Sequence, residues 1–177
     1  MNNEIIKILK NGGIGVLPTD TIYGLVGSAL NKKTIKRIYE LRQRNPRKPF
    51  IILIGSLNDL KLFKIKLDEY SKKVLDGIWP GKVSVVLSGL AFRLPKNLWL
   101  RKLLNQTGPL VAPSANPERM PPAKTIKEAK KYFGDKIDFY INKGKLDSLP
   151  STLIQIKNKN LFILRQGTVK IANNLFK

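Results

Sequence analysis

Apolar residues recur along this chain in two patterns, which polar and glycine- or proline-rich breaks separate. In five segments they recur at intervals of three and four residues, the spacing of one face of a helix. Capping residues and the glycines or prolines that follow mark the helix ends. The expected helices begin at Asn2 or Asn3, Asn31, Ser56, the residues before Val74, and Thr125, and they end near Gly12, Pro46, Leu62, Trp79 and Gly134.

Elsewhere the apolar residues form short continuous runs of strand length, which is typical of strands buried on both faces. These runs predict strands at residues 14–18, 49–55, 83–89, 108–116, 137–141, 151–156 and 161–167. Helices alternate with strands early in the chain, and strands cluster late. The pattern predicts one α/β domain over residues 1–177, built around a twisted mixed sheet with flanking helices.

The stretch VLPTDTIYGL, residues 16–25, interrupts this pattern, because a proline, two threonines and an aspartate stand between apolar runs. Asp20 and Thr21 fit a turn. Read alone, the stretch is either a turn or a place where a ligand binds, and Tyr23 could line a pocket or pack in the core.

Composition removes several kinds of chemistry. The chain has no cysteine and no histidine, so thiolate nucleophiles, imidazole bases and the usual zinc ligands are excluded. Lys and Arg number 33 against 12 Asp and Glu, a net charge of +21. That charge fits a polyanionic partner such as RNA or a nucleotide, and it equally fits a surface that is simply rich in lysine.

No apolar run approaches the roughly 20 residues of a membrane span. The N-terminus also lacks the features of a signal peptide. We therefore expect a cytoplasmic protein with no membrane partner.

The segment LRQRNPRKPF, residues 41–50, crowds four cations together: Arg42, Arg44, Arg47 and Lys48. Cations at a helix C-terminus are favourable, and this explains one or two of them. Four repel one another unless an anion such as a polyphosphate lies among them, and arginine forks suit phosphate oxygens.

Five further polar positions lie at the ends of expected strands. In APSANP, Ser114 and Asn116 form either a simple turn or a rigid loop that hydrogen-bonds a ligand. Arg93 in AFRLP either reaches out to solvent or is paired. Ser151 opens one late strand and Arg165 closes another, at a sheet edge where a site can form.

In order, PTDTIYGL, RQR with KP, WPG, AFRLP, PSAN, STLIQI and LRQG resemble the motifs of the YrdC/TsaC family of threonylcarbamoyl-AMP synthases, in its short single-domain form. The resemblance runs from about residue 5 to 168. It implies a basic concave surface and the formation of threonylcarbamoyl-AMP and pyrophosphate from L-threonine, bicarbonate and ATP. The product would serve the threonylcarbamoyladenosine modification of tRNA position 37 through a downstream transferase complex.

The resemblance also assigns roles to matching positions. It places Thr19, Arg93 and Ser151 at L-threonine. It gives catalytic and ATP-binding roles to Arg42, Arg44 and Lys48, and ATP contacts to Ser114, Asn116 and Arg165. Arg42 stands where the family has a lysine, and Glu118 and Arg119 stand where it often has Ser-Gly after SANx.

Mg²⁺ is expected to arrive with ATP rather than at a site of its own. The alternative function is a non-catalytic module of the same fold that binds tRNA or double-stranded RNA. A carbamoyl-adenylate-forming relative in hydrogenase maturation is disfavoured, because such domains usually sit in long proteins with cysteine-rich zinc fingers.

Overall fold

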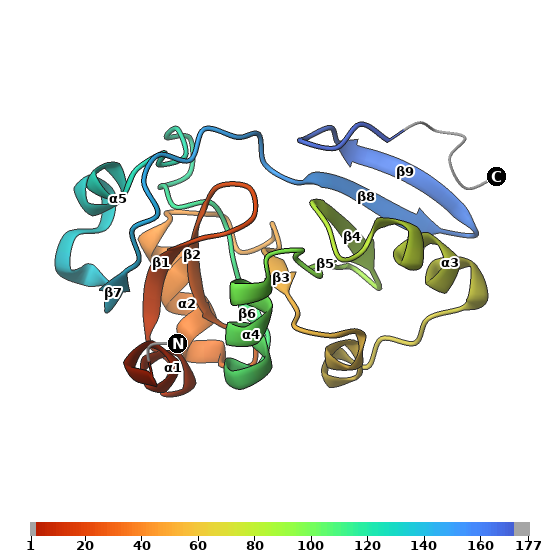
Figure 1. Cartoon of the computed structure of the whole chain (residues 1–177), viewed down its shortest axis with the longest axis horizontal. Coiled ribbons are helices and arrows are strands. Elements are labelled where there is room, and N and C mark those ends of the chain that lie inside the picture. Colours follow the sequence, from red (N-terminus) through yellow and green to blue (C-terminus); the bar gives the residue numbers. More distant parts are fainter. Residues whose placement is uncertain (1–2, 172–177) are drawn as a thin grey trace.

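A single mixed sheet of nine strands runs through the molecule, in the spatial order β7-β1-β2-β6-β3-β5-β4-β8-β9 (Figure 1). The computed structural model describes residues 3–171. The strands are β1 (Ile14–Pro18), β2 (Tyr23–Ser28), β3 (Ile51–Leu53), β4 (Val83–Leu87), β5 (Leu90–Arg93), β6 (Leu110–Val111), β7 (Phe139–Tyr140), β8 (Thr152–Lys157) and β9 (Asn160–Arg165).

Parallel and antiparallel pairs mix in this sheet. The pairs β1–β7, β3–β5 and β4–β8 are parallel, and the others are antiparallel. The last strands of the chain therefore separate: β7 lies at one edge beside β1, whereas β8 and β9 extend the other edge beside β4. The expected α/β fold with one mixed sheet is confirmed.

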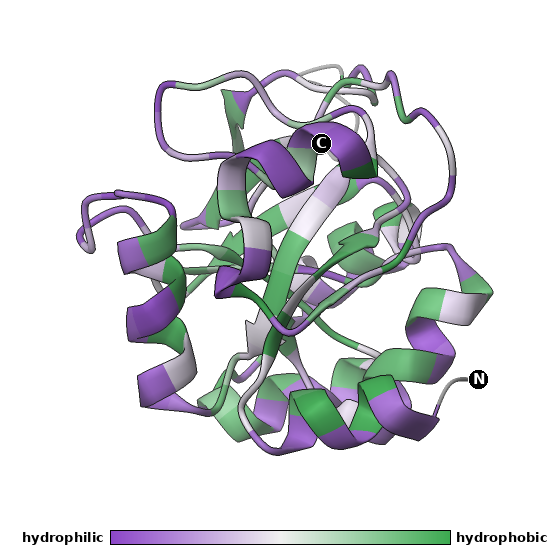
Figure 2. Cartoon of the chain, turned by 90° about the vertical axis from the view of Figure 1, so that its left-hand side faces the viewer, coloured by the Kyte–Doolittle hydropathy of each residue, from purple (hydrophilic) through white to green (hydrophobic). Residues whose placement is uncertain are grey.

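Helices cover both faces of the central strands, so the side chains of one strand alternate between two cores. In β1, Ile14 and Val16 join a core shared with α2 (Lys32–Leu41), α3 (Glu69–Ile78) and α5 (Ile126–Phe133). Leu17 joins the opposite core, under α1 (Asn3–Lys10) and α4 (Leu98–Thr107). Burial on both faces explains why the strand reads as a continuous apolar run. Figure 2 shows apolar strands at the centre and polar outer helix surfaces.

Polar caps fix the helix starts. The side chain of Asn31 accepts hydrogen bonds from the backbone N–H of Lys33 and Thr34 at the start of α2, and Thr125 caps α5 in the same way. The helix expected after Ser56 is a 3₁₀ helix, η1 (Leu57–Phe63), and a second short one, η2 (Gly134–Lys136), follows α5. These contacts satisfy N–H groups that a helix leaves free.

Four elements lie outside the sequence expectation: β2, β5, α4 and the short η2. Gly24 and Gly27 lower the strand signal of β2. Gly27 is required by packing, because a Cβ there would meet the side chain of Thr34 on α2. The start of α4 has a readable signal, since Asn97 caps it by accepting from the N–H of Leu100.

In the described residues 3–171, the helices are too short or too polar to cross a membrane.

Candidate functional site

A cleft of about 690 Å³ opens across the middle of the sheet. Its walls come from the 19–22 turn, the loop after α2, the turn after β6 and the β8–β9 pair. Six cations line it: Arg42, Arg44, Arg47, Lys48, Arg93 and Arg165. No Asp or Glu of the described chain lines it. The basic hollow that the resemblance implies is therefore present, and its charge suits a polyanionic ligand.

The tight turn between β1 and β2 presents two threonines to the cleft. The Thr19 hydroxyl donates to the carbonyl of Ile22 at 2.7 Å and lies 3.1 Å from the Thr21 hydroxyl. Both threonines are buried. Because the Thr19 hydroxyl closes the turn, it is held in one orientation at the cleft wall.

Arg93, the last residue of β5, is buried beside this turn. Its Nη2 lies 3.0 Å from Oδ1 of Asp20, and its Nη1 donates to Thr21 Oγ1 at 3.4 Å. Arg93 Nε has no hydrogen-bond partner within residues 3–171. Burial lowers the pKa of Arg93, the nearby Asp20 carboxylate opposes that shift, and Arg165 adds to it. A buried arginine of this kind is paired, not solvent-directed, and it keeps donor capacity for a carboxylate.

The loop after α2 carries Arg44 and Lys48 at the cleft edge, and aromatic packing anchors it. The Tyr39 ring stacks on Phe50 with centroids 4.0 Å apart, and the Tyr39 hydroxyl donates to the carbonyl of Lys48 at 3.1 Å. Arg44 lies over the Phe50 ring at 5.7 Å, a cation–π geometry. The position of Arg44 is thereby set by the core-facing Phe50.

Arg42 joins this loop to the turn after β6. It is 4% exposed, and its Nε donates to the carbonyl of Asn116 at 2.8 Å, while Nη2 donates to Ser114 Oγ at 3.2 Å. Burial lowers its pKa to about 10, with Arg44 adding to the shift and Glu118 opposing it. The guanidinium therefore acts first as the tie between two walls of the cleft.

The turn itself is built on β2. The N–H of Leu25 donates to the carbonyl of Pro113 at 2.9 Å, and the N–H of Ala115 donates to that of Tyr23 at 3.0 Å. Ser114 faces the cleft, whereas the Asn116 side chain donates to the carbonyls of Pro117 and Met120. Asn116 thus shapes the loop from behind rather than lining the cleft.

The opposite wall is the start of β8 and the end of β9. The Ser151 hydroxyl is buried 2.9 Å from that of Ser84. Arg165 Nη2 donates to the Ser151 carbonyl at 2.8 Å. Burial lowers the pKa of Arg165, and Arg44 across the cleft adds to this. The two ends of the chain's late hairpin are thereby fixed against β4.

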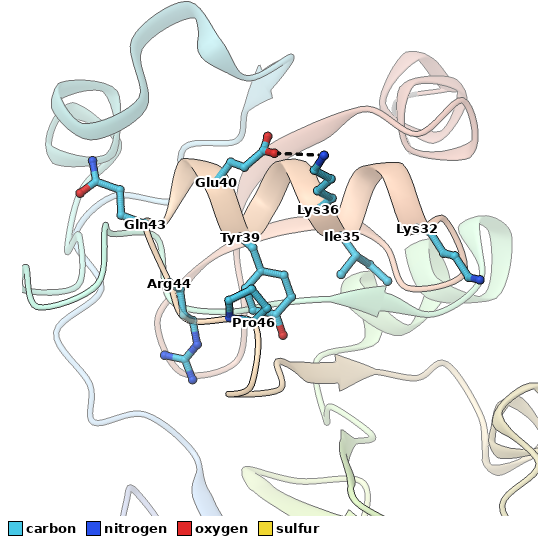
Figure 3. A pocket seen from close by; sticks show the side chains of 8 residues that line it. All are labelled: Lys32, Ile35, Lys36, Tyr39, Glu40, Gln43, Arg44 and Pro46. Carbon is cyan, nitrogen blue, oxygen red and sulfur yellow. Dashed lines mark ion pairs between the residues drawn. The ribbon is translucent and has the colours of Figure 1, made fainter.

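A second hollow of about 510 Å³ runs along the outer side of α2 (Figure 3). Figure 3 shows Tyr39, Pro46 and Arg44 along one side of it, and the ion pair of Lys36 with Glu40 above. Arg44 is the residue that it shares with the cleft. None of the other predicted site residues lines it, so the cleft is the better candidate site.

Eight of the nine predicted site residues line the cleft, and Asn116 supports it from behind. Their roles toward ligands stay predictions. Sequence reasoning missed the ion pair of Asp20, which was interpreted as a turn residue, and the contacts of Thr21 and Glu118. The sequence indicates that Arg93 needs an acidic partner if it is buried, but it does not indicate which residue that partner is. Tyr23 packs in the core, with its hydroxyl donating to the carbonyl of Gly144 at 2.8 Å.

The nine-stranded mixed sheet, its flanking helices and the cationic cleft define an α/β domain of the YrdC-like fold. The chain belongs to the Sua5/YciO/YrdC family, described as "Telomere recombination", whose model matches residues 7–167.

Individual relatives agree with this assignment. A threonylcarbamoyl-AMP synthase of Marinobacter nauticus is 30% identical, over 72% of this chain and 75% of the relative. The structure of Pyrococcus abyssi Sua5 complexed with L-threonine is 27% identical, with a TM-score of 0.83 over 93% of this chain and 53% of that protein. The present chain therefore spans about half of that Sua5. Escherichia coli YciO shares the fold, with a TM-score of 0.84 at 23% identity over 95% of this chain and 89% of that protein.

Proposed function

We propose that this protein forms threonylcarbamoyl-AMP and pyrophosphate from L-threonine, bicarbonate and ATP. The observation that carries the proposal is one cleft with two chemically distinct ends. A buried arginine, Arg93, stands beside two threonine hydroxyls at one end, and Arg44 and Lys48 stand at another. The first suits an amino acid, and the second suits polyphosphate.

The chemistry needs no histidine or cysteine. The threonine amine and bicarbonate give a carbamate and water. A carbamate oxygen then attacks the α-phosphorus of ATP, a new P–O bond forms, and the bond to the β-phosphate oxygen breaks to release pyrophosphate. The attacking group is already an anion, so positioning and charge neutralisation supply most of the catalysis.

The residues divide between the two ends. Arg93, Thr19 and Ser151 hold L-threonine, with Arg93 facing its carboxylate. Arg44, Lys48 and Arg165 neutralise the phosphates, and Ser114 meets the nucleotide. Arg42 and Asn116 act mainly by holding the turn of Ser114 in place.

Mg²⁺ enters as part of the MgATP substrate, bound to phosphate oxygens. The labile product then passes to a transferase complex that modifies tRNA position 37.

The direct test is incubation with ATP, L-threonine and labelled bicarbonate, followed by a search for label in an adenylate. Label that depends on threonine supports the proposal, and its absence contradicts it.

Arg44→Ala should abolish pyrophosphate release. Lys73→Ala removes an exposed cation on α3, away from the cleft, and should leave the rate unchanged.

The competing function is a non-catalytic RNA-binding module, which the net charge of +21 favours. Thermal shift separates the two. A synthase should be stabilised by threonine with ATP, whereas a module that binds RNA alone gains nothing from threonine.

A further inference from the structure

Glu118 places a carboxylate against the cations of the cleft. Its Oε1 lies 2.9 Å from Lys48 Nζ and 3.7 Å from Arg44 Nη1. Both cations line the cleft, whereas Glu118 itself does not.

The backbone holds this carboxylate in place. The N–H of Glu118 donates to the carbonyl of Arg42 at 2.6 Å, and Glu118 Oε2 accepts from the N–H of Asn45 at 3.3 Å. Arg119, the next residue, has a left-handed φ of 72°. The turn after Asn116 therefore aims Glu118 at the basic loop through several independent contacts.

An anion is needed at this place when no ligand is bound. Arg42, Arg44, Arg47 and Lys48 lie within seven positions of one another, and like charges so close repel. The hydrogen bond from Lys48 lowers the pKa of Glu118, and Arg44 adds to that shift. The carboxylate is thus ionised at neutral pH and offsets part of the repulsion.

A polyphosphate would offer the same cations a stronger anion. Arg44 and Lys48 would then exchange a carboxylate for phosphate oxygens, and the ligand would meet the repulsion of the displaced Glu118. Every polyphosphate bound at this end carries that cost, and its departure is assisted by return of the carboxylate.

We propose that Glu118 is an internal anion that holds Arg44 and Lys48 while the site is empty and competes with polyphosphate for them. It is an affinity-setting residue for ATP and pyrophosphate, and it speeds release of the pyrophosphate product. The inference rests on the proposed function for its ligands. A purely structural role for Glu118 would not predict that polyphosphate binds more tightly once the charge of Glu118 is removed, whereas this proposal does.

Glu118→Gln tests the charge with little change in shape, since the amide oxygen still accepts from Asn45. We expect ATP and pyrophosphate to bind the variant about fivefold more tightly by calorimetry, the scale of one nearby exposed charge. Pyrophosphate should also inhibit turnover more strongly. Glu69→Gln is the matched control. Glu69 pairs with Lys72 on α3, so this substitution removes the same charge far from the cleft.

Glu118→Ala provides the second variant, with the carboxylate and its hydrogen bond to Asn45 both removed. If Glu118 competes with polyphosphate, this variant should also bind pyrophosphate more tightly than the wild type does. Weaker binding in both variants would overturn the inference and make Glu118 an anchor of the loop. A failure of the proposed function is distinguished from a failure of this inference by the labelled-bicarbonate assay, in which the wild-type protein would then make no labelled adenylate.

Discussion

Arg93 and Asp20 form an ion pair with Nη2 and Oδ1 3.0 Å apart, and their side chains are only 5% and 7% exposed. Asp20 belongs to the turn between β1 and β2, and Arg93 ends β5, so the pair joins distant parts of the sheet. Asp20 Oδ2 also accepts from the N–H of Lys96 at 3.3 Å. The pair thereby fixes the cleft wall that Arg93 and Thr21 form.

Asp20→Asn should destabilise the fold by about 3 kcal/mol, because it leaves Arg93 buried without its compensating charge. Urea denaturation measures the change. Asp147→Asn is the control, since Asp147 pairs with Lys124 on the exposed surface and such pairs contribute little. Equal stability of Asp20→Asn and the wild type would show that the ion pair is dispensable.

Arg42→Lys tests the tie between α2 and the turn after β6. Lysine keeps the charge but cannot serve the Asn116 carbonyl and Ser114 hydroxyl together in the planar fork of arginine. We expect a loss of about 1–2 kcal/mol in unfolding free energy. The variant should also be cleaved faster by proteases within residues 114–120. An unchanged cleavage rate there would show that Arg42 does not hold the turn after β6 to α2.

Gly27→Ala tests the close approach of β2 and α2. The added methyl group meets the Thr34 side chain, and overpacking of this kind costs about 1–3 kcal/mol. Thr34→Ser in the same chain removes the opposing methyl and keeps the hydroxyl that donates to the Gly12 carbonyl at 2.8 Å. The double variant should recover part of the lost stability in thermal unfolding. No recovery would place the strain elsewhere.

Acidification should protonate Glu118 and break its ion pairs with Arg44 and Lys48. Its pKa in the folded protein lies below the ordinary value of 4.5, so its stabilising contribution is complete above that value and is lost as pH falls through the folded pKa. The stability difference between wild type and Glu118→Gln should therefore be constant near neutral pH and shrink below 4.5. Urea titrations at a series of pH values measure it, and a difference that grows on acidification would contradict the assignment.

Local signals predicted much of the fold. Asn31 and Thr125 begin helices where a capping side chain precedes apolar spacing, and the apolar run of β1 is buried throughout. The strand β2 was missed because Gly24 and Gly27 are chosen for close packing rather than for strand propensity. That requirement exists only once Thr19 and Thr34 are placed around them.

The candidate site was predicted less evenly. Thr19, Ser114 and Arg165 were placed together by the order of family motifs, and all three line the cleft. The partner of Arg93 was not predictable, because it depends on which strand lies beside which. Glu118 was equally hidden, since its contact with Lys48 crosses 70 positions of the chain.

The order of the strands has a consequence for the newly made chain. Thr19 leaves the ribosome early, but the cleft wall that carries Arg165 belongs to β9, which reaches the sheet through β8 at its far edge. Contacts of such long sequence separation form late. The chain therefore has no complete cleft until β9 has been synthesised and has paired with β8.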